Sequence, residues 1–332
     1  MHPIVILSIT LFHLPFVQEK SETKNWLTSR GYQAIQLDKL ATGHETIQAK
    51  LNGRSGRFIV DTGAGTTVIH VAHRKKYKVT GKAVRSETAA GVGGEFRVSY
   101  FPIKTIQLGQ AEIQLKEIAT ANLGGILSAL GSRAGYQIDG IIGQDALAKV
   151  AGILNVGEQT LFTRKPVNIS GAESVGNDRL HYEFEKHLVS QNYHSHELQH
   201  LNTGHFTIPT VINGKDGTFV LDSGARASCI HRPRLQQFNL SKDNQVGNVI
   251  AGGGAGGGTF SREYALQSIQ IGKQDVKLSR ITATDLTAVV KELTARNNVS
   301  VDGVIGQDIL VTHEAIVDIA ANRLYLLKTV EN

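Results

Sequence analysis

Short apolar runs separated by turn residues dominate the chain. Residues 47–51 and 58–60 are two such runs, and Asn52-Gly53 lies between them. Asn-Gly between apolar runs is the strongest local signal for a tight β-hairpin, so two antiparallel strands are predicted here. A further strand pair is expected around residues 96–106, after a glycine-rich tip at 90–94. Helical periodicity is confined to short stretches, at 122–130 and 285–295.

The same pattern occurs twice along the chain. A shift of 161 places residues 25–70 on 186–231 with 19 of 46 positions identical. Farther on the shift becomes 163 and aligns residues 139–145 with 302–308, so two residues are inserted in the second copy. The glycine-rich loop Gly252–Gly258 is the expected place for them. Such a duplication predicts two homologous lobes, mainly β with short helices.

The repeat also predicts the domain boundaries. The first lobe is expected at 25–164 and the second at 186–332. A linker at 165–185 joins them, because residues 165–178 are polar, contain Gly and Pro and lack periodicity. Residues 1–24 hold a 14-residue apolar stretch, Ile4–Val17, which suits the core of a signal peptide better than a membrane span. We therefore expect export to the periplasm or outside the cell, with a buried first strand as the alternative.

Charge and cysteine content narrow the function classes. The chain has 35 basic and 29 acidic residues, and the basic ones are scattered. No phosphate-binding patch is expected, and therefore no nucleic-acid partner. The single cysteine, Cys229, excludes an internal disulfide framework and multi-cysteine zinc patterns.

One aspartate follows the same apolar strand in each copy. Asp61 ends the run Phe58-Ile59-Val60, and Asp222 ends Phe219-Val220-Leu221. A carboxylate at the end of a buried apolar strand needs hydrogen-bond donors or a partner group. If pseudo-twofold packing brings the two together, repulsion and burial make the pair share one proton. One group is then a base and the other an acid, which together can activate a water without a metal.

These residues resemble those of the retropepsin-like (clan AA) aspartic proteases, in a bacterial-type tandem arrangement, and more distantly those of the pepsins. The resemblance rests on Asp61-Thr62-Gly63-Ala64 and Asp222-Ser223-Gly224-Ala225, on the flap-like glycines, and on Ile141-Ile142-Gly143 and Val304-Ile305-Gly306. It implies two acid-protease-like β-barrel lobes related by a pseudo-twofold axis. It also implies peptide-bond hydrolysis between the lobes, with a peptide or protein substrate, no cofactor and no metal, in a monomer that is an internal pseudo-dimer.

The family's roles carry over to matching positions. Asp61 and Asp222 would be the catalytic pair, Gly63 and Gly224 would hold the carboxylates through backbone N–H groups, and Thr62 and Ser223 would cross-link the loops. Ala64 and Ala225 complete the loops. The flaps that close over an extended substrate strand would be formed by Gly91, Gly93, Gly94, Gly256, Gly257 and Gly258.

Other interpretations remain open. One is that the lobes only bind peptides, and another is that active sites form between like lobes of two chains. His196-Glu-Leu-Gln-His200 matches the zinc protease motif, yet the repeat overlays it on a predicted strand, where the histidines lie about 13 Å apart. The duplicated histidines His44 and His205 lie at strand boundaries, where structural hydrogen bonding is expected.

Overall fold

The fold is that of a computed structural model, which describes residues 16–165 and 171–328. Most of the apolar stretch Ile4–Val17 lies outside these residues, so export stays a prediction. Within the described residues no helix is long and apolar enough to cross a membrane. The first helix, α1 (Phe16–Thr28), is followed directly by the strands of the first lobe.

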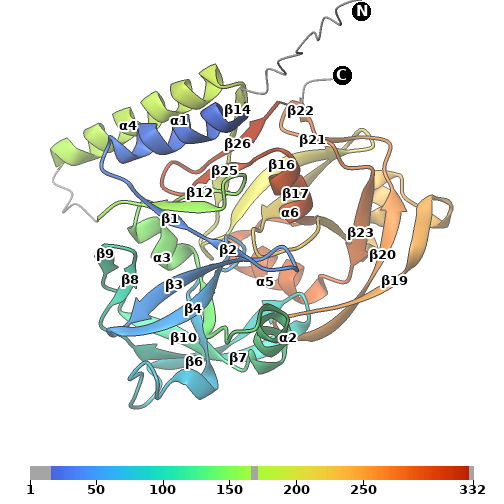
Figure 1. The fold of residues 1–332 in the computed structure, drawn as a ribbon. Helices are drawn as coiled ribbons and strands as arrows, with labels where there is room; N and C mark the ends of the chain where they lie inside the picture. The colour runs from blue at the N-terminus through green and yellow to red at the C-terminus, as the bar shows by residue number, and fades with distance from the viewer. Residues whose placement is uncertain (1–15, 166–170, 329–332) are drawn as a thin grey trace, which may run out of the picture.

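Each lobe is built on one 10-stranded sheet. The first contains β2 (Asp38–Lys39), β3 (Glu45–Leu51), β4 (Arg54–Val60), β5 (Val68–His70), β6 (Arg85–Gly91), β7 (Gly94–Pro102), β8 (Ile106–Leu108), β9 (Ala111–Ile113), β10 (Glu117–Ala121) and β11 (Gly140–Ile142). The second contains β15 (Gln199–His200), β16 (Phe206–Ile212), β17 (Lys215–Leu221), β18 (Cys229–His231), β19 (Gln245–Gly254), β20 (Gly257–Ala265), β21 (Ile269–Ile271), β22 (Gln274–Asp275), β23 (Arg280–Thr284) and β24 (Gly303–Ile305). Strand order is equivalent in the two sheets, which confirms the two homologous lobes. Figure 1 shows the first lobe in blue to green and the second in yellow to red.

The hairpins at the start of each lobe form as the sequence predicts. β3 pairs with β4 and β16 pairs with β17, both antiparallel. Their turns have positive φ at both central residues, 47° and 74° at Asn52-Gly53 and 48° and 74° at Asn213-Gly214. Asparagine and glycine tolerate this conformation better than other residues, which explains why both copies keep the pair.

A third sheet joins the lobes. It has six strands in the order β1-β13-β12-β25-β26-β14. Its members are β1 (Gln33–Gln36), β12 (Ile153–Asn155), β13 (Thr160–Thr163), β14 (Tyr193–Glu197), β25 (Ile316–Asp318) and β26 (Arg323–Leu327). The pairing of β12 with β25 is the seam, because one strand comes from each copy. The lobes are therefore fixed to each other by backbone hydrogen bonds as well as by side chains.

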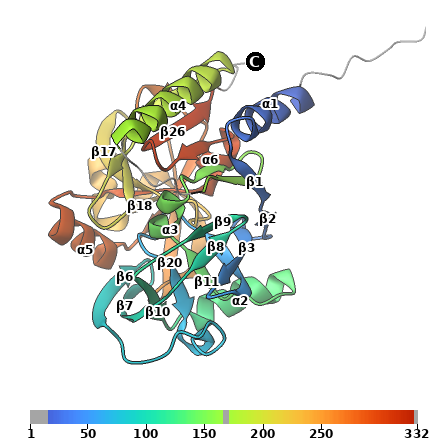
Figure 2. The same cartoon turned by 90° about the vertical axis from the view of Figure 1, so that its left-hand side faces the viewer.

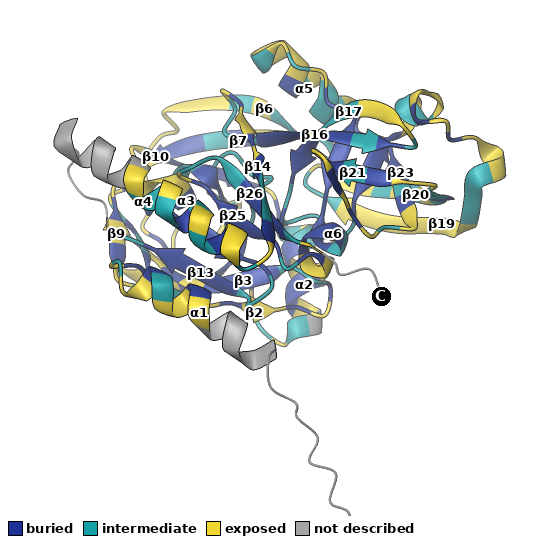
Figure 3. Cartoon of the chain, turned by 90° about the horizontal axis from the view of Figure 1, so that it is seen from above, coloured by how far each residue is buried: buried dark blue, intermediate teal, exposed yellow. Residues whose placement is uncertain are grey.

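Two antiparallel helices lie beside each other on this third sheet (Figures 1 and 2). They are α1 and α4 (Gly171–Ser190). Trp26 stacks near Phe184, and Phe184 meets Tyr325 of β26 edge to face. The outer surfaces of both helices are exposed, whereas the strands beneath them are buried (Figure 3). The remaining helices, α2 (Gly124–Ala134), α3 (Gln144–Lys149), α5 (Thr287–Asn297) and α6 (Gln307–Thr312), are short and occur in equivalent pairs.

The prediction of an irregular linker was wrong from Gly171 onward. That segment is the helix α4, and its C-terminal half buries Phe184 and Leu188 against the third sheet. The hydrophobic positions in its first half are too sparse to reveal a helix, so this element depends on tertiary packing rather than on local periodicity.

The location predicted for the two inserted residues was also wrong. In the first lobe β6 and β7 pair without a break, from Arg85 with Tyr100 to Gly91 with Gly94. In the second lobe the register shifts between Val246 and Ile250 of β19. The extra residues therefore form a β-bulge at 247–249, before the glycine-rich tip, and Gly247 in this bulge has a φ of 72°.

Candidate active site

The two sequence-predicted aspartates follow the central strands β4 and β17. β4 runs parallel to β11, and the backbone N–H of Asp61 donates to the Ile142 carbonyl at 3.1 Å. Asp222 donates in the same way to Ile305 of β24 at 3.0 Å. The segments Ile141-Ile142-Gly143 and Val304-Ile305-Gly306 thus pack beside the Asp loops. Each loop is held by the neighbouring strand, β11 or β24, at the C-terminal end of β4 or β17.

The two carboxyl groups meet at the interface between the lobes. A Cβ atom added to Gly63 would lie 2.6 Å from Oδ2 of Asp222, and one added to Gly224 would lie 2.6 Å from Oδ1 of Asp61. Each aspartate therefore packs on the glycine of the other loop, where no side chain fits. Both partners belong to one chain, so this geometry does not require a second copy.

Electrostatics at the pair favour a shared proton. Burial raises the pKa of the Asp222 carboxyl well above its usual range, and the charge of Asp61 and a hydrogen bond with it act in the same direction. Each carboxylate also accepts a backbone hydrogen bond within its own loop, from Gly63 to Asp61 Oδ1 and from Gly224 to Asp222 Oδ1, both at 2.7 Å. One proton shared by the two carboxyl groups is compatible with all of these contacts.

Hydrogen bonds exchanged by Thr62 and Ser223 join the two loops. Thr62 N donates to Ser223 Oγ at 3.0 Å, and Ser223 N donates to Thr62 Oγ1 at 2.9 Å. Each hydroxyl donates in turn to a carbonyl of the opposite strand, Leu221 for Thr62 and Val60 for Ser223. Both side chains are fully buried. Serine in one copy thus makes the same contacts as threonine in the other.

A second set of loop contacts was not assigned from the sequence. Gln144 Nε2 donates to the Thr62 carbonyl at 3.0 Å, and Gln307 Nε2 donates to the Ser223 carbonyl at 2.8 Å. Ala64 and Ala225 are anchored by these helix starts as well, because their carbonyls accept the N–H groups of Gln144 and Gln307. The duplication of Gly143-Gln144-Asp145 as Gly306-Gln307-Asp308 could have revealed this role.

The aspartates next to these glutamines, Asp145 and Asp308, do not cap their helices. Gly143 and Gly306 occupy the N-cap positions, with no side-chain cap. Asp145 instead accepts hydrogen bonds from the backbone N–H and the hydroxyl of Thr67, at 2.8 and 2.6 Å. Asp308 binds Ser228 in the same way. The bonds fix the far end of each Asp loop, three residues beyond the alanine.

The glycine-rich flap tips meet each other. The flaps are the hairpins β6–β7 and β19–β20, and Gly93 N donates to the Ala255 carbonyl at 2.9 Å. A Cβ on Gly91 or Gly93 would collide with Ala255 or Gly257, and one on Gly256 with Gly94. Gly94, Gly256 and Gly257 have positive φ, whereas a Cβ on Gly258 would make only an ordinary contact with the Gly252 carbonyl, at 3.8 Å. Only glycine permits the tips to cross this closely.

Only the first of these two flaps is tied to the opposite lobe by charged side chains in the described part of the chain. Glu292 of α5 accepts the Ala90 N–H at 2.6 Å, Arg296 pairs with Glu87 at 3.1 Å, and Lys291 approaches Glu95 at 4.0 Å. At the positions equivalent by the shift of 163, the second flap has Ile250 for Glu87 and Gly258 for Glu95, and α2 has Ala129 for Glu292. The two flaps are therefore held unequally.

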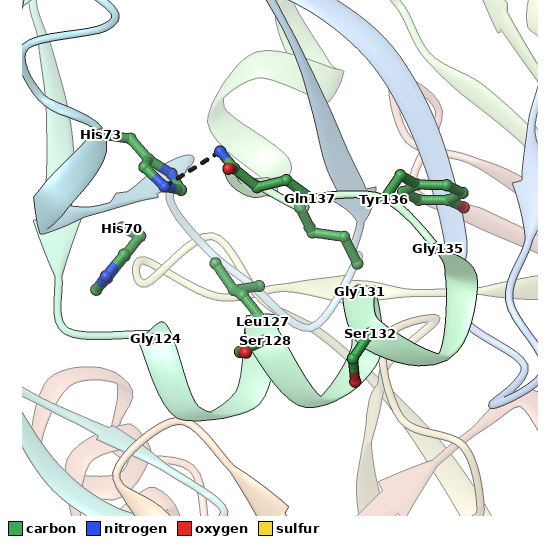
Figure 4. Close-up of a pocket in the computed structure, with 11 residues that line it drawn as sticks. His70, His73, Gly124, Leu127, Ser128, Gly131, Ser132, Gly135, Tyr136 and Gln137 are labelled. Carbon is green, nitrogen blue, oxygen red and sulfur yellow. Dashed lines mark hydrogen bonds between the residues drawn. The ribbon is translucent and has the colours of Figure 1, made fainter.

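A cavity of about 550 Å³ lies away from the carboxyl pair, against α2 (Figure 4). His70 and His73 line one side, and Leu127 and Ser128 of α2 line the other. Gln137 contacts His73 at 3.3 Å and donates to Asp139 at 2.6 Å. Asp61 and Asp222 do not line this cavity.

The zinc-like motif is extended, as the repeat predicted. His196 belongs to β14 and His200 to β15, so the one-face helical spacing of the zinc motif is missing. His196 is buried and bonded to Gln274 at 3.0 Å, and His200 packs on Phe206. Cys229 is free and buried, and burial raises the pKa of its thiol to about 12, which opposes a nucleophilic role.

Comparison with known proteins agrees with the fold. The family model described as aspartyl protease matches twice, at residues 47–146 and 208–309. Among solved structures, an aspartic proteinase from Irpex lacteus is 13% identical, with a TM-score of 0.50 over 90% of this chain and 98% of that chain. A protease of EIAV complexed with the inhibitor HBY-793 is 24% identical over 31% and 85%, with a TM-score of 0.25. Basic 7S globulin from soybean is 10% identical over 90% and 95%, with a TM-score of 0.45. No curated protein matches.

Proposed function

This chain belongs to the family of retropepsin-like aspartyl proteases, and we propose that it is an aspartic endopeptidase that uses Asp61 and Asp222 as one catalytic pair. The observation that carries the proposal is the packing of each aspartate on the glycine of the other Asp loop. Two carboxyl groups in such contact cannot both ionise easily, so one is available as a base and the other as an acid.

The proposed reaction needs no group outside the chain except water. Asp61, charged, accepts a proton from a water between the carboxyls while the water oxygen bonds to the peptide carbonyl carbon. Asp222, protonated, gives its proton to the carbonyl oxygen, which yields a tetrahedral diol. Proton transfer from Asp61 to the amide nitrogen then accompanies breakage of the C–N bond, and Asp222 recovers its proton from the collapsing diol. The pair ends in its starting state.

The flaps suit an extended peptide substrate. β6 and β19 are edge strands of their sheets, and the tips of their hairpins meet, with Gly93 N donating to the Ala255 carbonyl. A substrate would have to separate these tips to enter, and their closure over it would exclude bulk water from the reaction.

The test is cleavage of a peptide library by the purified protein, with identification of the products. Cleavage that a statine-containing peptide inhibits, and that a chelator leaves intact, would support the proposal. Inhibition by the chelator alone would favour metal chemistry. Binding of library peptides without any cleavage would favour the alternative, a peptide-binding module with this fold.

The activity is expected to peak at about pH 5 to 6. Because its pKa is raised, Asp222 keeps its proton to a higher pH than an ordinary carboxyl group does. The alkaline limb of the activity profile therefore moves to higher pH. Ala64 and Ala225 add to this shift, since their methyl groups cannot donate a hydrogen bond to either carboxylate. The measurement is kcat/KM against pH for one cleaved peptide. A maximum near pH 2 would contradict the expectation.

A further inference from the structure

Two histidines occupy equivalent turns next to the Asp loops. His44 precedes β3 and His205 precedes β16, and their carbonyls accept the N–H groups of Leu40 and Leu201, both at 2.8 Å. Their Nδ1 atoms lie 2.9 Å from Thr42 Oγ1 and 3.0 Å from Thr203 Oγ1. The ring orientation is thus fixed by a hydroxyl two residues earlier in both copies.

Each ring reaches the Asp loop of the opposite lobe. His44 hydrogen-bonds the backbone of Gly224, and His205 hydrogen-bonds the backbone of Gly63. In the second copy the turn itself presses on the Asp61 loop: a Cβ on Gly65 would collide with the Thr203 carbonyl, and one on Gly204 would lie 2.9 Å from the Gly65 carbonyl. This contact is close enough to transmit a displacement of the His205 turn to the Asp61 loop.

The neutral form of each imidazole satisfies this arrangement. Nδ1 accepts the threonine hydroxyl proton, which leaves the Nε2–H to donate to the glycine carbonyl. Burial lowers the pKa of both rings and so favours the neutral form. The charged groups that act on His44 are Asp61 and Arg226, and those that act on His205 are Asp61 and His200.

We propose that His44 and His205 are positioning residues for the reaction, and that each aligns one catalytic carboxyl from across the lobe interface. The inference rests on the proposed function. The glycine that each ring binds is the same residue whose N–H holds the aspartate of that loop, Gly63 for Asp61 and Gly224 for Asp222. A ring that shifts would therefore displace the glycine whose N–H group orients the carboxylate.

Glutamine and asparagine substitutions separate this role from a merely structural one. The amide nitrogen of Gln can reach the place of Nε2, whereas that of Asn reaches only the place of Nδ1. His205→Asn and His44→Asn are expected to lower kcat by about 10-fold to 100-fold with little change in KM, because small misalignments of reacting groups act on the rate. His205→Gln and His44→Gln should retain most of kcat. His194→Asn, on β14, is the matched control and should match the parent.

A second readout does not depend on turnover. Carbon-13 NMR of the Asp61 and Asp222 carboxyls, followed against pH, reports how strongly the two groups interact. The Asn variants should bring the two titration steps closer together, and the Gln variants should not. If the parent protein cleaves no peptide, the proposed function is refuted. The titration then still tests whether the histidines position the carboxyl groups. The inference is overturned if Asn and Gln variants behave alike, or if all four lose thermal stability with kcat and titration unchanged.

Discussion

Asp61→Asn and Asp222→Asn are each expected to lower kcat for peptide cleavage by about 10³-fold. Either change removes one of the two groups that must transfer a proton, while the amide keeps the size of the carboxyl. Loss of activity through unfolding is not expected, because each substitution removes the repulsion between two carboxyls in contact. The measurement combines kcat on one cleaved peptide with the thermal midpoint of each variant.

Asp216→Asn provides the matched control, since Asp216 is exposed near the start of β17, in the same lobe as Asp222. It should retain the activity of the parent. Full activity in either Asp61→Asn or Asp222→Asn would rule out a single site built from both lobes. Loss of activity in Asp216→Asn as well would mean that the assay reports folding and not chemistry.

The second large effect is expected at Glu45, which is fully buried in the first lobe. Neither of its carboxylate oxygens has a hydrogen-bond partner in the described part of the chain. Phe206 occupies the equivalent position in the second lobe. Burial raises the pKa of Glu45 to about 8, although nearby Lys39 lowers it in part. At neutral pH the folded protein must therefore carry this side chain protonated.

The sign of the effect on stability follows from proton binding. Between about pH 4.5 and 8 the folded state holds a proton on Glu45 that the unfolded state has released, so the free energy of unfolding falls as pH rises. Glu45→Met removes this penalty and is expected to stabilise the protein by about 3 kcal/mol at pH 7. Urea unfolding at pH 5, 7 and 8.5 measures both the gain and its pH dependence.

Glu112→Met, at an exposed position of β9, is the control and should change neither quantity. In Glu45→Met the free energy of unfolding should vary less with pH than in the parent. An unchanged pH dependence would mean that Glu45 ionises freely in the folded protein and that the argument from burial fails.

The duplicated segments could be read from the sequence because they depend on local rules. Asn52-Gly53 and Asn213-Gly214 determine hairpins through backbone conformation, and the Asp loops follow apolar strands in both copies. The β-bulge at 247–249 could not be located, because an alignment of the copies shows that two residues were added without showing which backbone groups lose their partners.

Contacts between distant segments were harder to predict. The six strands of the third sheet bring together residues from both ends of each copy, and no strand among them has a distinctive sequence pattern of its own. The duplication of His44 and His205 indicated a shared role, and hydrogen bonding was expected. That each ring binds the opposite lobe depends on how the lobes pack, which no local pattern encodes.

The seam between β12 and β25 joins halves of one polypeptide. Dilution cannot separate subunits that are covalently tethered, so specific activity should not depend on enzyme concentration as it does for a dissociating homodimer. Because both halves are encoded in one chain, their sequences can also diverge from each other. In a homodimer every substitution appears in both halves. Here Gly65 in one half and the equivalent Arg226 in the other can change independently.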